Sequence, residues 1–545
     1  MQKDHPYHKI TFYEGKKGEV KKVVLLYSGN FDISALIKWI KQEYKAEIIL
    51  LMIDIGQEYD FKKIKRQALT SGATNAQVID AKDEFADEYV AKGIQANATY
   101  QTYNHLSIPL ARLLLAKSAV KTAALVGADA IVHDVVGEDE QVILESTILT
   151  LNPDIKIIAP AREQNLTEKD LLSFNKPHEG TPKQSNKTPY TFSTNLWGIS
   201  IKNNDIENSV IALHVEEILN ATKPLKKQPQ TPEIVHIEFV KGIPVALNNK
   251  KMKLSELIMA LNEIGKIWGL GVTSHIEDQL IGLKKRVILA APAAEILILA
   301  HKKLEEYVST KAENEFKPLI DMKWANLCKD GLWYEPLMDD LTAYIQKVNQ
   351  KVTGKVKIKI SQGNQQVIAL ETPHNLFEQK LPTFISNEEI NPNATAGFIE
   401  LHSLPMRLAS KADKTVFISI GKRANKIKLL PQMKQLHQLG YKLYATYKTH
   451  KFLRANNMEA IPVHKISEGH LKPNLADLLN TNRFNFIINI PIEKKVIRAD
   501  EKVISQKALQ NHVPLLNTIT KTQELVKKLQ MLQMKDAQTQ QEVHN

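Results

Sequence analysis

The sequence predicts an α/β protein with parallel sheets and more than one domain. A chain of 545 residues exceeds what a single core usually holds and indicates about two to four domains. Short apolar runs with no period of their own, such as residues 23–26, are typical of buried parallel strands. Helical patterns lie between these runs, and strands that alternate with helices favour a doubly wound sheet.

Three buried strands are predicted near the start of the chain, at residues 23–27, 47–53 and 128–132. Ligands of doubly wound sheets bind at the carboxyl ends of the strands. We therefore expect the loops that follow Tyr27, Ile53 and His133 to converge.

Further elements are expected along the rest of the chain. The pattern predicts strands at 235–240 and 356–360, helices at 293–307 and 336–350, and a fresh α/β alternation from 415 onward. In that last part the expected elements are strands at 415–420, 442–445 and 486–489 and helices at 429–439 and 521–534.

Composition narrows the class of protein. The apolar fraction of 43% is typical of a globular chain, and the single cysteine, Cys328, excludes a disulfide framework and a cysteine-based metal site. No apolar run is long enough to span a bilayer, and residues 1–20 are polar. We expect a cytoplasmic protein that makes no membrane contact, although secretion without a cleavable signal stays open.

The net charge of +12 is unevenly distributed. Residues 413–545 hold 22 Lys and Arg against 10 Asp and Glu, whereas residues 1–412 hold 50 of each. So basic a segment suits an anionic ligand or partner, and the alternative is a lysine-rich solvated surface. The basic residues lack interleaved aromatic residues, which disfavours nucleic acid as the partner.

The turn after the first strand is a candidate anion site. Ser28, Gly29 and Asn30 form the turn, and a helix is expected to begin between Asp32 and Ser34. Successive backbone N–H groups and the helix dipole at such a turn favour an oxyanion. The Gly-Lys-Ser/Thr ending of a Walker loop is absent, and an ordinary βα turn is the alternative. Asn tolerates a positive φ, although its side chain occupies space that a phosphate would need.

This turn resembles the pyrophosphate loop of ATP-pyrophosphatase-type enzymes, and within them that of the argininosuccinate synthase family, which reads Tyr/Phe-Ser-Gly-Gly-Leu-Asp-Thr-Ser. Ser28, Gly29, Asp32 and Ser34 match, and Asn30 replaces the second glycine. The resemblance covers about residues 22–405, through matches at 54–57, 195–200, 396–399 and 404–405.

The resemblance implies an enzyme that couples citrulline to aspartate with ATP and Mg²⁺, releases AMP and pyrophosphate, and forms a homotetramer through C-terminal arms. It implies ATP-binding residues Tyr27, Ser28, Gly29, Asn30, Asp32, Ser34, Ile53 and His133. It also implies remnants of the substrate site at Thr191, Ser200 and Glu277.

The expected domains follow from the pattern and the resemblance together. They are an N-terminal extension (1–20), a nucleotide-binding domain (21–190), an α+β synthetase and oligomerisation domain (191–385), an arm (386–412), a Rossmann-like α/β domain (413–530) and a flexible tail (531–545).

The substrate site departs from the family. The residues that would hold aspartate fall on Val136, Asp139 and Glu140, and a lysine becomes Glu138. Adjacent acids repel anionic ligands unless a metal binds, and they are more often a solvated loop, so no metal site is assigned. In the citrulline site the family's residues are replaced at Asn104, Pro109, Ile143, Lys202 and Leu289.

The last domain resembles a methylglyoxal-synthase-like domain, the allosteric module of the large subunit of carbamoyl-phosphate synthase. Residues 443–449 and 465–469 carry the resemblance, and Lys426 matches a further lysine. The resemblance implies a pocket for a phosphorylated metabolite at Lys426, Thr446, Thr449 and Lys465, for binding rather than catalysis. The alternative is scattered surface lysines.

Three functions stay open at this point. The first is a diverged or inactive ligase that still binds ATP and senses a phosphorylated ligand through its last domain. The second is a functional argininosuccinate synthase in arginine biosynthesis, regulated by that domain. The third is an interaction scaffold without catalysis.

Overall fold

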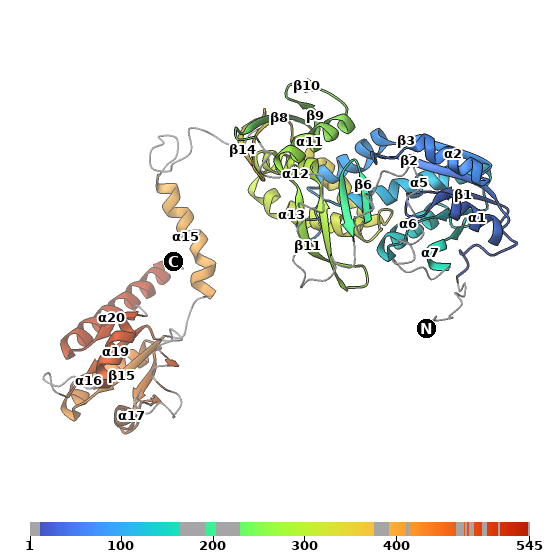
Figure 1. Ribbon diagram of the computed structural model, residues 1–545. Coiled ribbons are helices and arrows are strands. Elements are labelled where there is room, and N and C mark those ends of the chain that lie inside the picture. The colour runs from blue at the N-terminus through green and yellow to red at the C-terminus, as the bar shows by residue number, and fades with distance from the viewer. Residues whose placement is uncertain are drawn as a thin grey trace. The chain divides into compact units, whose positions relative to one another are not determined.

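The computed structural model divides into two compact units, residues 1–379 and 380–545, shown in Figure 1. It describes residues 11–163, 191–202, 206, 229–374, 376, 392–409, 414–464, 474, 477–478, 484–492, 499–510 and 513–542.

The first unit begins with a parallel sheet of five strands in the order β3-β2-β1-β4-β5. The strands are β1 (Lys22–Leu26), β2 (Glu47–Asp54), β3 (Asn75–Asp80), β4 (Ala130–His133) and β5 (Lys156–Ile158). The chain order reverses between β1 and β4, so their carboxyl ends flank the switch point at which such sheets bind ligands.

Helices cover both faces of this sheet. Along β1, Val23 and Leu25 pack on one side in the core of α1 and α2, while Val24 and Leu26 pack on the other side in the core of α5. The prediction of a doubly wound sheet is therefore confirmed. The helices are α1 (Ile33–Glu43), α2 (Phe61–Ser71), α3 (Lys82–Glu84), a π-helical turn (Phe85–Val90), α4 (Ala91–Gln95), α5 (Ser107–Val126), α6 (Glu138–Leu151) and α7 (Pro160–Glu163).

Two antiparallel sheets complete the first unit. One has the order β10-β9-β8-β13-β14 and the other β11-β12-β7-β6. Their strands are β6 (Thr191–Asn195), β7 (Gly198–Lys202), β8 (Glu233–Val240), β9 (Ile243–Leu247), β10 (Lys250–Lys251), β11 (Val272–Asp278), β12 (Lys284–Ala290), β13 (Gly354–Ser361) and β14 (Asn364–Glu371). The helices are α11 (Leu254–Trp268), α12 (Pro292–Val308), α13 (Lys311–Lys329) and α14 (Pro336–Asn349).

The turn between β6 and β7 joins the antiparallel part to the parallel sheet. The amide of Asn195 donates to the Ser107 carbonyl at 2.9 Å, and the indole of Trp197 donates to the His105 carbonyl at 2.8 Å. Both side chains are buried. These bonds hold β7 and its neighbour β12 beside the start of α5, where they can line a site.

The second unit contains α15 (Pro392–Ala409) and a parallel sheet in the order β17-β16-β15-β18-β19. The strands are β15 (Thr415–Ile420), β16 (Lys442–Thr446), β17 (Ile461–Val463), β18 (Phe486–Ile490) and β19 (Leu515–Leu516). The other helices are α16 (Arg423–Gln438), α17 (Tyr447–Arg454), α19 (Ala499–Gln510) and α20 (Ile519–Glu542).

Two stretches differ from the expectation. The helix α20 runs to Glu542, so it includes most of the residues expected to form a tail. In the N-terminal extension, the Gly15 amide donates to the Ile157 carbonyl at 2.9 Å, and Glu14 pairs with Ile157 beyond the edge of the sheet.

In the described parts of the chain, no helix has the length and apolar character that a membrane crossing requires.

Candidate nucleotide and substrate site

The loop between β1 and α1 has a well-supported shape. Gly29 has a φ of 91°, and a Cβ there would lie 2.7 Å from the Tyr59 hydroxyl oxygen. That hydroxyl donates to the Ser28 carbonyl at 2.8 Å, and the Tyr27 hydroxyl donates to the Phe31 carbonyl at 2.8 Å. Burial, with Asp134 adding to it, raises the pKa of Tyr59 to about 12, so the phenol keeps its donor proton.

The concave side of this loop holds a carboxylate of the chain itself. Asp134, just after β4, is fully buried. Its Oδ1 accepts the Ser28 amide at 2.8 Å and the Ser28 hydroxyl at 2.6 Å, and its Oδ2 accepts the Asn30 amide at 2.9 Å. The loops after β1 and β4 therefore meet, as expected, through an aspartate that the sequence motifs did not single out.

Three predicted loop residues have local roles in the structure. The positive φ occurs at Gly29, so Asn30 does not need the left-handed conformation that an asparagine tolerates. The Asn30 side chain instead donates to the Ser28 hydroxyl at 3.0 Å. Asp32 caps α1 by accepting the Ala35 amide at 2.8 Å, and Ser34 is half-buried in the first turn of α1. Their assignment to ATP stays a prediction.

The other two predicted ATP residues are buried behind the loop. Ile53, near the end of β2, lies in the core. His133 is fully buried and its Nε2 lies 3.0 Å from Oε1 of Glu145, which also accepts Nη1 of Arg162 at 2.7 Å. Burial would raise the pKa of Glu145, but His133 and Arg162 outweigh it and lower this pKa to about 2.

We expect this carboxylate to make the first unit sensitive to acid. Since its folded pKa lies below the ordinary value of 4.5, its contribution is present above about pH 5 and is lost as the pH falls toward 2. That contribution is about 3 kcal/mol by linkage. All five tryptophans precede residue 334, so their fluorescence during urea unfolding reports on this unit alone. Glu145→Gln should flatten the loss of stability between pH 5 and 2, and the exposed Glu256→Gln should not. An unchanged slope in Glu145→Gln would contradict the assignment.

Residues 138–140 form the start of the helix α6 rather than a loop. Glu140 is buried and forms an ion pair with the buried Arg112, whose Nε donates to it at 3.1 Å. Asp139 lies 3.8 Å from Nζ of Lys329. Basic residues of the chain therefore offset Asp139 and Glu140, where we expected that only a metal could do so. The described residues contain no group of three or more His, Cys, Asp or Glu suited to a metal ion.

Two of the three substrate remnants, Ser200 and Glu277, line a small cavity of about 60 Å³. Ser200, on β7, is buried and lines it, while Thr191 is the first residue of β6 and pairs with Lys202 of β7. The Glu277 carboxylate accepts hydrogen bonds from the side-chain amide of Asn104 at 2.7 Å and from Nζ of Lys329 at 3.2 Å. Burial opposes ionisation of Glu277, but the neighbouring His275, Lys329 and Asn104 lower its pKa to about 2. The one acidic remnant is therefore already neutralised from within the protein.

Sequence reasoning missed three residues that decide the character of this site, namely Arg112, Asp134 and Lys329. No sequence pattern links Arg112 to Glu140, which lies 28 positions later, and Lys329 lies 52 positions beyond Glu277. Only Asp134 had a signal, since it directly follows His133, where the loops were expected to converge.

In the second unit, three of the four predicted phosphate residues come together. The Thr446 hydroxyl donates to that of Thr449 at 3.2 Å, and the Lys426 ammonium donates to the Lys448 carbonyl at 2.9 Å. Burial, and then the charge of Lys448, lower the pKa of Lys426. These side chains lie near the carboxyl ends of β15 and β16, whereas Lys465 lies outside the described residues.

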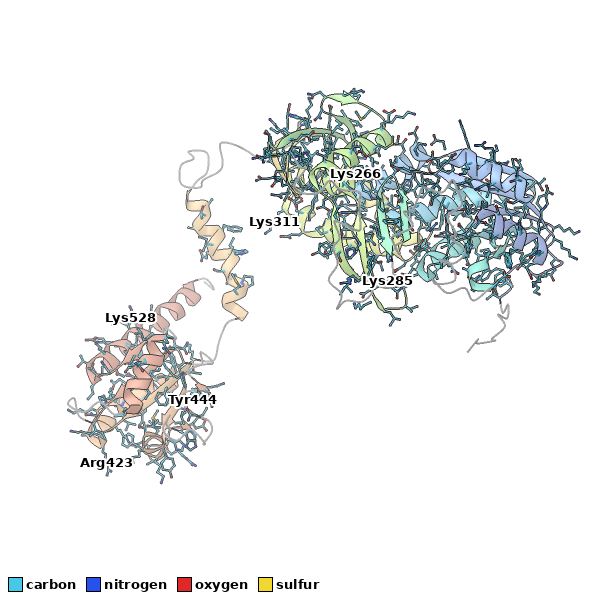
Figure 2. All side chains as sticks on the ribbon, viewed as in Figure 1. Lys266, Lys285, Lys311, Arg423, Tyr444 and Lys528 are labelled. Carbon is cyan, nitrogen blue, oxygen red and sulfur yellow. The ribbon has the colours of Figure 1, made fainter. Side chains whose placement is uncertain are left out.

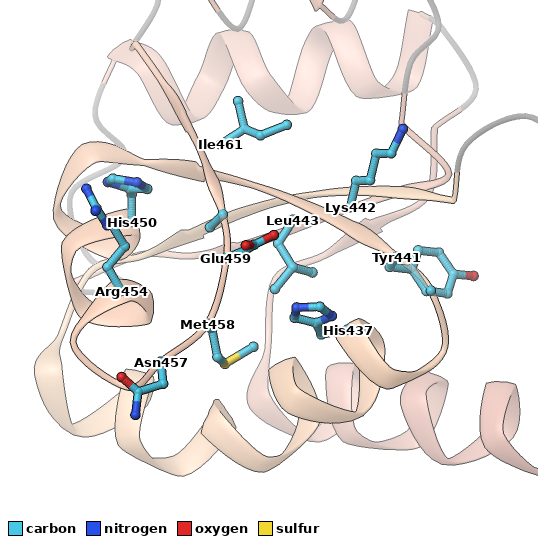
Figure 3. Close-up of a pocket in the computed structure, with 12 residues that line it drawn as sticks. His437, Tyr441, Lys442, Leu443, His450, Arg454, Asn457, Met458, Glu459 and Ile461 are labelled. Atoms are coloured by element: carbon cyan, nitrogen blue, oxygen red, sulfur yellow. The ribbon is translucent and has the colours of Figure 1, made fainter.

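A larger cavity of about 780 Å³ lies elsewhere in this unit, as Figure 3 shows. Residues at the amino ends of β16 and β17 line this cavity, whereas Thr446 lies at the carboxyl end of β16. Its polar lining includes His437, Lys442, His450 and Arg454. The predicted phosphate pocket is therefore not this cavity, and it stays a prediction.

The fold and the loop together define the class of protein. Its members carry a nucleotide-binding α/β domain of the HUP type that is joined to a synthase domain, and this chain adds a separate parallel α/β domain. Family models match in the same order. They are the arginosuccinate synthase N-terminal HUP domain (22–180), the arginosuccinate synthase C-terminal domain (190–409) and an MGS-like domain (428–517). The chain belongs to the argininosuccinate synthase family, and its last domain is MGS-like, which confirms both resemblances.

Relatives cover the first three quarters of the chain. Argininosuccinate synthase of Carboxydothermus hydrogenoformans is 36% identical over 396 residues, which is 72% of this chain and 98% of that protein. Argininosuccinate synthase of Geobacillus thermodenitrificans is 38% identical over 394 residues, covering 72% and 97%. A solved biotin carboxylase domain of a thermophilic 2-oxoglutarate carboxylase covers 65% of this chain and 64% of its own at 13% identity, but its TM-score of 0.15 supports no argument.

Proposed function

We propose that this chain is a diverged member of the family that no longer couples citrulline to aspartate. The observation that carries the proposal is the filled substrate site. Glu277, the acidic remnant, is bonded to Asn104 and Lys329, and the cavity beside it has room for only a few water molecules. Ile143 stands where the family pairs a carboxylate with arginine, and it is buried in the core.

Citrulline binding tests this proposal directly. Calorimetry of the full chain with citrulline, with and without ATP and Mg²⁺, should give no heat above dilution. Lys329→Met should not create binding, since the guanidinium for the carboxylate is also missing. Saturable citrulline binding to the unaltered chain would refute the proposal.

A second candidate is argininosuccinate synthesis itself. Relatives of that name are 36–38% identical over almost their full length, and this likeness favours the ordinary activity. We rank it second because function depends on the residues at the site rather than on the scaffold that carries them.

ATP stays the proposed nucleotide, with Mg²⁺ as its ion, since the matching HUP family uses ATP, but its phosphates can bind at this loop only when the Asp134 side chain leaves the amides of Ser28 and Asn30. The loop as it stands does not fit a phosphate, because Asp134 already accepts the amides of Ser28 and Asn30. A homo-oligomer also stays a proposal, supported by exposed apolar side chains on α15 such as Phe398, Ile399 and Leu401.

For the MGS-like domain we propose a small phosphorylated metabolite as ligand. Phosphate should raise the thermal midpoint of a fragment starting at residue 413, and binding at Lys426 should weaken in Lys426→Ala by about 1.5–3 kcal/mol. Lys528→Ala is the control, since Lys528 is exposed on α20 (Figure 2). Equal responses of the fragment and Lys426→Ala to phosphate would show that the lysines form only a charged surface.

A further inference from the structure

We infer that Asp134 fills the oxyanion cradle of the β1–α1 loop and thereby determines whether a phosphate group can bind there. This inference goes beyond the proposed function, because it rests on residues separate from the substrate cavity. The occupant of the cradle is a carboxylate of the chain itself, supplied by a residue 106 positions after Ser28.

The contacts are those of a bound oxyanion. Both oxygens of Asp134 are engaged, and together they accept two backbone amides and one hydroxyl at 2.6–2.9 Å. These lengths are in the range of hydrogen bonds to an ionised acceptor. A phosphate oxygen would require the same donors, since successive amides at a turn before a helix form an anion-binding concavity.

A phosphate cannot share the cradle with Asp134. The aspartate has no exposed surface, so it leaves no open position beside the amides of Ser28 and Asn30. A second anion at this distance would also meet direct charge repulsion. Groups that carry pyrophosphate are therefore excluded while Asp134 stays in place, and they bind only when its side chain leaves.

The cradle does not depend on Asp134 for its shape. Tyr59 holds the Ser28 carbonyl from the other side and packs against Gly29, and Asp32 caps the helix that follows. Removing the carboxylate should therefore leave the donors in position with an unoccupied space between them. This separates Asp134 from the residues that build the loop.

Inorganic pyrophosphate is the probe for the test, with the full-length chain in calorimetry. Asp134→Gly should bind pyrophosphate about tenfold more tightly than the unaltered chain, or better, because three donors become available. The matched control is Asp129→Gly. Asp129 also accepts two backbone amides next to β1, from Lys21 and Lys22 at 2.8 Å, but at the opposite end of the strand. The Asp129→Gly variant should bind pyrophosphate no better than the unaltered chain.

The outcomes are distinguishable. A folded Asp134→Gly that binds pyrophosphate no better than the unaltered chain overturns the inference, and so does an equal gain in Asp129→Gly. If Asp134→Gly fails to fold, Asp134→Ser is used, which shortens the side chain and should give a smaller gain; no gain there overturns the inference as well. Argininosuccinate formation by Asp134→Gly would refute the proposed function and leave this inference standing.

Discussion

No argininosuccinate should form above background when the full-length chain is supplied with citrulline, aspartate, ATP and Mg²⁺. A charged partner removed from a buried contact typically costs about 2–5 kcal/mol. The guanidinium expected at Ile143 is missing, and the carboxylate of Glu277 is occupied by Lys329. Two such losses together reduce turnover by several orders of magnitude.

Restoring the missing arginine alone should not rescue activity. Ile143 is only 1% exposed and belongs to the core. It also lies against Gly331, so closely that a side-chain Cβ at that glycine would be 3.0 Å from the Ile143 Cα. Ile143→Arg would bury a guanidinium at a core position that borders the small cavity, where Lys329 already neutralises Glu277, so we expect lower stability and still no product.

The measurement is the release of pyrophosphate together with direct detection of argininosuccinate. The enzyme of Carboxydothermus hydrogenoformans named above serves as the positive control in the same buffer. Robust turnover by the unaltered chain, or by Ile143→Arg, would show that our interpretation of the substrate site is wrong.

Arg112→Met should lower the unfolding free energy of the first unit by about 3–5 kcal/mol. The substitution leaves the buried Glu140 without the guanidinium that neutralises it, and a charge left in that situation is strongly destabilising. Since methionine keeps most of the side-chain volume, lost packing is not the main cause. Urea unfolding followed by tryptophan fluorescence gives the change for this unit.

Two further variants separate charge from packing. Lys117→Met alters a lysine on the same helix α5, whose ion pairs with Glu84 and Glu88 are more exposed, and it should cost no more than about 1 kcal/mol. The double variant Arg112→Met/Glu140→Met should recover most of the loss, because apolar groups can replace a buried pair at little cost. A loss in Arg112→Met no larger than in Lys117→Met would contradict the role of the pair.

The sequence by itself determined the local framework. The apolar runs predicted β1 and β2 within one residue at their ends, since a strand buried on both faces needs a continuous apolar stretch. The cap at Asp32 is likewise local, because its bond joins residues three positions apart. The Ser28–Asn30 turn has one local bond, between the side chains of Asn30 and Ser28, but Tyr59 and Asp134 also hold it.

Only the tertiary structure decided the electrostatic character of the site. Asp134 lies 104 positions after Asn30 and Lys329 lies 52 after Glu277, and no periodicity links such residues. From the sequence, residues 138–140 were three adjacent acids without compensation. In the fold, Arg112 reaches Glu140 from α5 and Lys329 reaches Asp139 from α13. Whether a charge is solvated, paired or bound to another loop depends on which elements pack together, and chain spacing does not encode that.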